Sequence, residues 1–151
     1  GIDGLASGVT LPVMVFFAVT AWMWGKTTLA LLPAALAGGL AGFLVYNFHP
    51  AKVFMGDTGS LFLGGMVCGL AFALDMPLVL ILVGIIYIME TVSVIMQVTY
   101  FKLTHGKRIF RMTPIHHHFE MGGWSEEKIF TVFVGITVLM CILAFIGVSG
   151  R

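Results

Sequence analysis

The fold is decided by residues 129–148, which read IFTVFVGITVLMCILAFIGV and contain no charged side chain. An α-helix needs about 20 predominantly apolar residues to cross the hydrocarbon core of a bilayer. The rest of the chain has the same character, since 59% of its 151 residues are hydrophobic, 10% are charged and the mean hydropathy is +1.04. Soluble domains carry about a quarter charged residues, so the sequence predicts an integral membrane protein.

Four further apolar segments precede this one, and the five together predict a single all-α membrane domain over residues 1–151. The predicted spans cover residues 5–24, 28–46, 60–74, 77–100 and 129–148. The third span would rise only about 22 Å, against a hydrocarbon thickness of about 30 Å. We therefore expect either local thinning and tilt or a preceding loop that dips into the membrane.

The polar residues gather in segments 1–4, 47–60 and 100–128, which share one side of the membrane if the five spans alternate in direction. That side holds Lys52, Lys102, Lys107, Arg108, Arg111 and Lys128, whereas the other side holds Lys26 and Arg151. Cytoplasmic loops carry the excess of Lys and Arg, so the first side is predicted to be cytoplasmic. The net charge of +1 gives no field that would suggest a nucleic-acid partner.

The first candidate site is the loop 47–60, NFHPAKVFMGDTGS, in which Asp57 directly precedes an apolar helix. One interpretation is a helix N-cap, because Asp accepts hydrogen bonds from the free N–H groups of a first turn. The other is a Mg²⁺ or phosphate site, since helix N-termini favour anions and carboxylates hold Mg²⁺ against phosphate oxygens. The spacing is not that of a P-loop.

The second candidate site is 113–120, TPIHHHFE, with three successive histidines. Adjacent imidazoles rarely converge on one zinc ion, and no further ligand follows at zinc spacing. We favour a loop that handles phosphate or protons, with Arg108 and Arg111 supplying fixed positive charge. For Lys102, Lys107 and Arg108, contact with anionic lipid is an equally good alternative.

Glu90, Ser93 and Gln97 recur at positions i, i+3 and i+7 of one predicted span. Such a stripe predicts a helix face that points to the protein interior or to a cavity. Because Glu90 lies several turns from the charged interface, we expect it to have a structural partner. A transporter that uses Glu90 and the histidines is an alternative, but transport predicts ionisable groups spread through the membrane depth.

Four segments carry a family resemblance: GIDGLA at 1–6, the loop 47–60 with its MGDTGS, PIHHHFE at 114–120 and GWSE at 123–126. They resemble the phospho-N-acetylmuramoyl-pentapeptide transferases, a branch of the bacterial polyprenyl-phosphate N-acetylhexosamine-1-phosphate transferases. The resemblance implies a ten-helix inner-membrane enzyme, usually a homodimer, with a cytoplasmic cleft. Its substrates would be UDP-MurNAc-pentapeptide and undecaprenyl phosphate, its products lipid I and UMP, and its cofactor Mg²⁺. A related transferase that uses UDP-GlcNAc is the nearest alternative.

The resemblance also implies roles for individual residues. Asp57 matches the catalytic aspartate that binds Mg²⁺, and Phe54 matches an aromatic that stacks on uracil. The histidines near the pyrophosphate and sugar would be His116, His117 and His118. The remaining substrate-binding residues would be Gly1, Ile2, Asp3, Asn47, Lys52, Gln97 and Arg108.

The resemblance covers only the second half of the family's length. The family's paired aspartates and a nearby lysine would lie before Gly1, so we expect this chain alone to be incomplete. A non-catalytic fragment or an assembly subunit is a third hypothesis beside the enzyme and the transporter.

Overall fold

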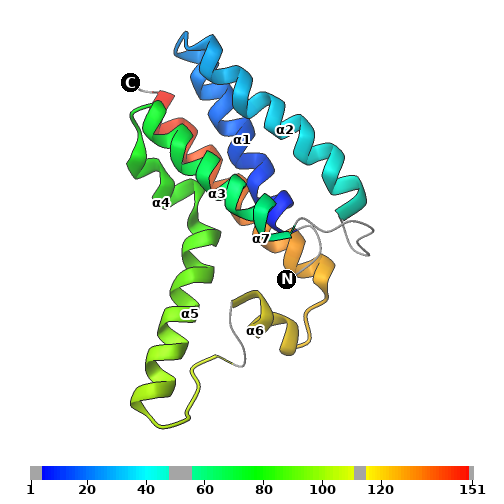
Figure 1. Ribbon diagram of the computed structural model, residues 1–151, viewed down its shortest axis with the longest axis vertical. Helices are drawn as coiled ribbons and strands as arrows, with labels where there is room; N and C mark the ends of the chain where they lie inside the picture. Colours follow the sequence, from blue (N-terminus) through cyan, green and yellow to red (C-terminus); the bar gives the residue numbers. More distant parts are fainter. Residues whose placement is uncertain (1–4, 48–55, 111–114, 150–151) are drawn as a thin grey trace.

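The computed structural model describes residues 5–47, 56–110 and 115–149, and every regular element among them is helical. Four long helices form a bundle, and a fifth extends away from it (Figure 1). The bundle consists of α1 Leu5–Met23, α2 Thr27–Asn47, α3 Gly56–Ala73 and α7 Glu126–Ser149. The extended part consists of the 3-10 turn η1 Pro77–Val79, α4 Leu80–Val83 and α5 Ile85–Leu103, and the short α6 Ile115–Met121 follows.

Helix α1 is the centre of the bundle, because α2, α3 and α7 all pack against it. The main hydrophobic core includes fully buried Met14 and Phe17 from α1, and it also takes Leu74 and Val83 from the α3–α4 region. A second cluster gathers Leu5, Val9, Ile86, Ile129 and Phe133, which joins the starts of α1, α5 and α7.

Figure 1 shows the ends of the bundle helices sorted into two groups along the long axis. The starts of α1, α3 and α7 and the end of α2 lie toward the lower end, near α6. The α1–α2 turn, the end of α3 and the C-terminal end of α7 lie toward the upper end. At two of these upper turns the backbone is left-handed, with φ +75° at Gly25 and φ 56° at Asp75. The helices α1, α2 and α3 therefore alternate in direction along this axis, and α7 runs the same way as α1 and α3.

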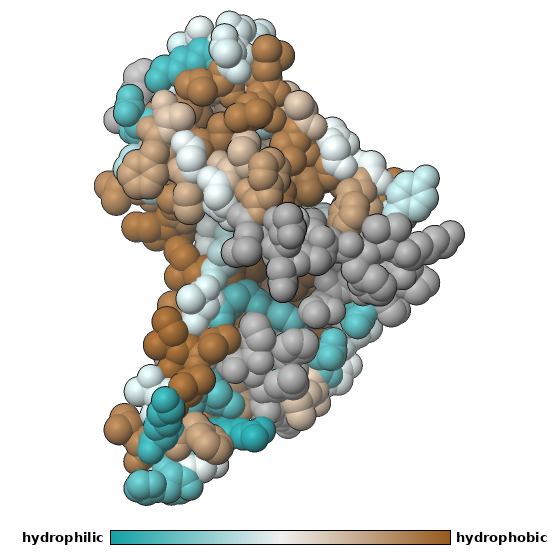
Figure 2. Space-filling model, viewed as in Figure 1, coloured by the Kyte–Doolittle hydropathy of each residue, from teal (hydrophilic) through white to brown (hydrophobic). Residues whose placement is uncertain are grey.

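Hydrophobic residues cover much of the face of the molecule drawn in Figure 2, and many large hydrophobic side chains of the long helices are exposed. Among the described residues two stretches, Thr27–Tyr46 and Glu126–Val148, are long and apolar enough to span a membrane, and α4 with α5 would make a third. Shorter apolar stretches, Ser7–Met23 and Phe62–Ala73, lie in α1 and α3. These features confirm an all-α, polytopic membrane protein.

Three boundaries differ from the prediction. The predicted span 77–100 is not one helix, because the chain bends by 79° at a break between Val83 and Ile85. Helix α3 begins at Gly56, four residues before the predicted start of the third span, so Asp57 lies within the first turn. The histidine segment, predicted to be loop, forms the seven-residue helix α6.

Candidate active site

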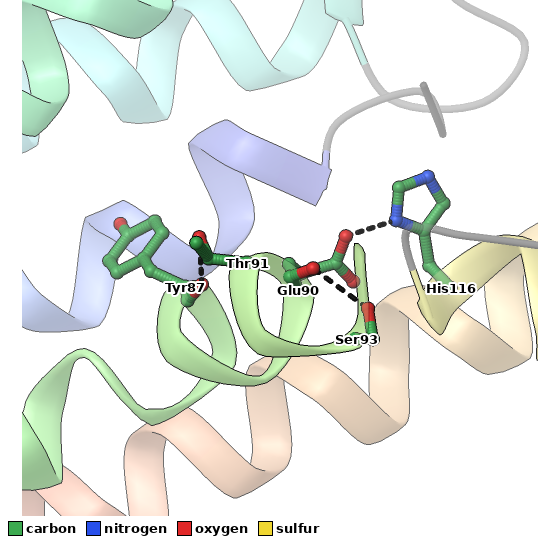
Figure 3. Close-up of polar contacts among 5 residues, drawn as sticks. All are labelled: Tyr87, Glu90, Thr91, Ser93 and His116. Atoms are coloured by element: carbon green, nitrogen blue, oxygen red, sulfur yellow. Dashed lines mark hydrogen bonds and ion pairs between the residues drawn. The ribbon is translucent and has the colours of Figure 1, made fainter. Parts of the chain in front are cut away.

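Helix α6 brings the histidines against the polar stripe of α5. His116 lies near the start of α6, and its Nδ1 is 2.6 Å from Oε2 of Glu90 in the middle of α5 (Figure 3). Both side chains are largely buried, with 9% of His116 and 18% of Glu90 exposed. The expected structural partner of Glu90 is thus His116 itself, so the premise that Glu90 stands far from the charged loop was wrong.

The rest of the stripe is also buried, as predicted. Ser93 is 2% exposed, and its hydroxyl donates to the backbone carbonyl of Glu90 at 2.7 Å. Gln97 is 8% exposed, and its amide oxygen accepts hydrogen bonds from the backbone N–H groups of Ile109 and Phe110, both at 3.0 Å. Its amide nitrogen donates to the carbonyl of Phe110 at 2.8 Å. Gln97 therefore fastens the segment that leads toward α6.

Aromatic rings lie against His118, the other histidine of α6 whose side chain is described. The ring of His118 packs edge-on against Phe110 and Phe119, with centroid distances of 5.6 and 5.7 Å. Phe119 in turn stacks on Trp124 at 4.8 Å and meets the buried Phe133 edge-on. These contacts hold α6 against the start of α7 through apolar area and favourable ring geometry.

The start of α7 is a well-formed helix N-terminus beside this aromatic cluster. The Ser125 hydroxyl accepts the backbone N–H of Lys128 at 3.2 Å, and Glu126 and Glu127 occupy the first turn, where the helix dipole favours negative charge. The Lys128 ammonium lies 4.3 Å from the centre of the Trp124 ring, a cation–π contact. Both features fix the entry of the chain into α7.

Arg108 is exposed beyond the end of α5, and its guanidinium lies over the Phe101 ring at 5.9 Å. Lys102 and Lys107 are also exposed nearby. This arrangement keeps the cationic groups at the surface, where either a phosphate or a lipid headgroup can reach them.

Several predicted site residues lie wholly or partly outside the described residues. Asn47 is the last residue of α2, Asp57 is the second of α3 and His117 is within α6, but their side chains are not described. Those wholly outside are Gly1, Ile2, Asp3, Lys52 and Phe54. The predicted site residues that the structure does bring to one region are Gln97, His116 and His118.

The described residues offer few donor groups for a metal ion. In the part of the chain that the structure describes, no group of three or more His, Cys, Asp or Glu residues could hold a metal ion. Mg²⁺ commonly takes only one or two protein carboxylates and completes its sphere with water and phosphate oxygens. A single aspartate in the first turn of α3 fits that chemistry.

Three features of this region were not predicted from the sequence: helix α6, the Glu90–His116 contact and the Phe119–Trp124 stack. Signals existed for the helix and the start of α7, because Thr113-Pro114 and Ser125-Glu126 are typical helix-start pairs. The contact with Glu90 had no sequence signal, since it joins residues 26 positions apart.

The structure is that of a helical membrane protein in which carboxylate, amide and histidine side chains gather where α5 meets α6, and comparison with known proteins identifies its family. Residues 1–75 match the family model described as Glycosyl transferase family 4. The chain is 58% identical over 147 residues to the phospho-N-acetylmuramoyl-pentapeptide-transferase of Clostridium botulinum (strain Eklund 17B / Type B). It is 56% identical to the protein of that name from Clostridium beijerinckii and 54% identical to that from Clostridium kluyveri.

These alignments include 97% of this chain but only 45–46% of each relative, so the chain spans slightly less than half their length. The chain belongs to the phospho-N-acetylmuramoyl-pentapeptide transferase family, and the resemblance drawn from its motifs is confirmed. It is a multi-pass protein of a bacterial membrane.

Proposed function

We propose that this chain forms part of an enzyme that transfers phospho-N-acetylmuramoyl-pentapeptide from its UDP carrier to undecaprenyl phosphate. The products are UMP and lipid I, a precursor of peptidoglycan. The observation that carries the proposal is the 58% identity to transferases of that name across 97% of the chain. Because the chain spans under half of those relatives, the activity belongs to a longer polypeptide or to a complex with the remaining part.

The reaction is a phosphoryl transfer. An oxygen of the lipid phosphate attacks the β-phosphorus of the UDP-sugar, and the bond from that phosphorus to the bridging oxygen breaks. UMP leaves with the electron pair of the broken bond. The attacking phosphate is already largely ionised at neutral pH, because its second pKa is about 6. Positioning and electrostatic stabilisation therefore account for most of the catalysis.

Asp57 is the proposed Mg²⁺ ligand. When bound, Mg²⁺ supplies positive charge that offsets the charge developing on the diphosphate oxygens. Asp57 is the second residue of α3, and the dipole at this end of the helix also favours the substrate's anionic groups. Both the charge of Mg²⁺ and the helix dipole would stabilise the transition state, in which the leaving group carries more negative charge than in the bound substrate.

The substrate's other parts are assigned to the predicted binding residues. Phe54 stacks on the uracil, and the nucleoside is bound by residues near the start of the chain, Gly1, Ile2 and Asp3, with Asn47 and Lys52. The diphosphate and the sugar are assigned to His116, His117, His118 and Arg108. For Gln97, the three hydrogen bonds to residues 109 and 110 support a role in shaping the wall of the cleft.

We also propose a location and an assembly. The active site faces the cytoplasm at the inner membrane, which is supported by six Lys and Arg residues in the polar segments of that side against two on the other. A homodimer is the expected assembly by family resemblance. The expected donor is the MurNAc-pentapeptide nucleotide, and comparing UMP release from this donor and from UDP-GlcNAc distinguishes the two transferases.

Asp57→Asn in the full-length enzyme tests the metal assignment. UMP release should fall at least about a hundredfold, the scale for removing one group that stabilises developing charge. The matched control is Asp75→Asn, the same chemical change at the other end of α3. Asp75 is exposed and has φ 56°, a conformation that Asn tolerates. The Asp75→Asn enzyme should therefore release UMP at the parent rate. Near-normal turnover of Asp57→Asn across a Mg²⁺ titration contradicts the assignment.

A further inference from the structure

The contact between Glu90 and His116 has a property that the rest of the polar stripe lacks. It joins two ionisable side chains from different helices, whereas Ser93 bonds within α5 and Gln97 bonds to backbone groups. Figure 3 shows the His116 ring pointing from α6 toward the Glu90 carboxylate on α5. A carboxylate in an apolar helix is unfavourable unless it is paired, so the position of Glu90 is explained only together with His116.

The Glu90 carboxylate constrains the state of the ring. When Glu90 is ionised, its Oε2 can only accept a hydrogen bond, so Nδ1 of His116 is then the donor. In a neutral imidazole the other nitrogen, Nε2, then carries the lone pair, because the hydrogen bond at one nitrogen sets the tautomer at the other. Glu90 thus fixes both the direction of the ring and the nitrogen that can accept a proton or a hydrogen bond.

The contact also supports α6, a helix of seven residues that is too short to be stable alone. Near the end of α6, Phe119 stacks on Trp124. Near its start, His116 is held by Glu90. Loss of the pair should therefore disturb the histidines locally while the aromatic contacts keep α6 on α7.

From these observations we infer that Glu90 is a positioning residue, which orients His116 toward the diphosphate substrate through the hydrogen bond to Nδ1. The inference rests on the proposed transferase function. Glu90 is a carboxylate inside an apolar helix, and it acts on the reaction through His116 without touching a reacting atom.

The test uses the full-length enzyme with Glu90→Leu, Glu90→Gln, His116→Leu and the double variant Glu90→Leu/His116→Leu. Glu90→Leu should lower kcat for UMP release by about tenfold or more, as for other groups that orient a histidine, with KM for the UDP-sugar nearly unchanged. Glu90→Gln should retain more activity, because its amide oxygen still accepts from Nδ1–H. The double variant should be no slower than His116→Leu.

The control is the substitution Thr91→Val. Thr91 follows Glu90 on α5, and its exposed hydroxyl donates to the carbonyl of Tyr87 at 2.9 Å. This variant should retain kcat. The inference is overturned if the losses of the two single variants multiply in the double variant, since Glu90 would then act independently of His116. A fall in kcat of Glu90→Leu that matches the loss of folded protein, measured by thermal unfolding, also overturns it.

A second measurement needs no turnover. In histidine-labelled protein, ¹⁵N NMR reports which ring nitrogen carries the proton, and the His116 signals are those absent from His116→Leu. The expected result is a proton on Nδ1 in the parent and a changed signal in Glu90→Leu, whereas an unchanged signal rejects the positioning role. If the parent releases no UMP, the proposed function fails while this measurement still decides the state of His116.

Discussion

Gln97 and Phe110 are joined by hydrogen bonds in both directions: the side-chain amide donates to the Phe110 carbonyl at 2.8 Å and accepts the Phe110 N–H at 3.0 Å. The same oxygen also accepts the N–H of Ile109 at 3.0 Å. One buried side chain therefore satisfies three polar groups of a segment without regular structure. A side-chain amide carries a donor and an acceptor side by side, which an ionised carboxylate does not.

We predict that Gln97→Glu destabilises the full-length protein by about 1–3 kcal/mol, the range for a buried polar group left without its partner. A carboxylate can accept from Ile109 and Phe110, but it cannot donate to the Phe110 carbonyl and it repels that oxygen. The measurement is the thermal midpoint of the detergent-solubilised protein. Thr99→Val, at an exposed position on the same helix, is the control and should leave the midpoint unchanged. An equal midpoint for Gln97→Glu and the parent would show that the amide donor contributes nothing.

The burial of the Glu90, Ser93 and Gln97 stripe could be predicted from the sequence, because polar residues at helical spacing in an apolar span must avoid lipid. The partners of Glu90 and Gln97 could not be predicted. They lie between residues 109 and 116, after a polar segment in which no periodicity sets the path of the chain. A contact of this kind depends on tertiary packing, which single-residue patterns do not encode.

The bend between α4 and α5 is another feature that could not be predicted from the sequence. Residues 77–100 are predominantly apolar despite their polar stripe, so hydropathy alone predicts one straight span. The break falls at Gly84, where φ is −97° and ψ is 17°, outside helical values. A glycine inside an apolar run is a weak signal, since glycines in the helices α2 and α3 cause no comparable break.

We predict that Gly84→Ala destabilises the protein or reduces the bend of 79°. A Cβ at Gly84 would lie 2.7 Å from the backbone carbonyl oxygen of Leu80, which already accepts the N–H of Gly84 at 2.9 Å. A backbone oxygen cannot move aside as a flexible side chain would, and overpacking of this kind costs about 1–3 kcal/mol. The thermal midpoint measures the loss of stability, and spin-label distances between α3 and the end of α5 measure the bend.

The matched control is Gly69→Ala in α3, where nothing lies within 4 Å of an added Cβ. Alanine is favoured over glycine in a helix interior by about 0.5–1 kcal/mol, so this variant should be as stable as the parent or slightly more so. If Gly84→Ala behaves like Gly69→Ala in both measurements, the close approach to Leu80 is not what sets the bend.

A hydrogen bond between the side chains of Thr10 and Tyr87 links α1 to the beginning of α5. Thr10 is 1% exposed, so the two hydroxyl groups satisfy each other in an apolar region. Beside them, Val9 and Ile86 belong to one buried cluster, so apolar packing and a hydrogen bond anchor α5 at the same place.

We predict that Tyr87→Phe destabilises the protein by about 1 kcal/mol, because it leaves the Thr10 hydroxyl without this partner. Thr10→Val should have a similar effect on its own. The double variant should cost less than the sum of the two, since residues that share one hydrogen bond show interaction free energies of about 0.5–3 kcal/mol. Thermal midpoints of the four proteins provide the cycle. Strict additivity would mean that α5 is anchored at this point by the apolar contacts of Ile86 alone.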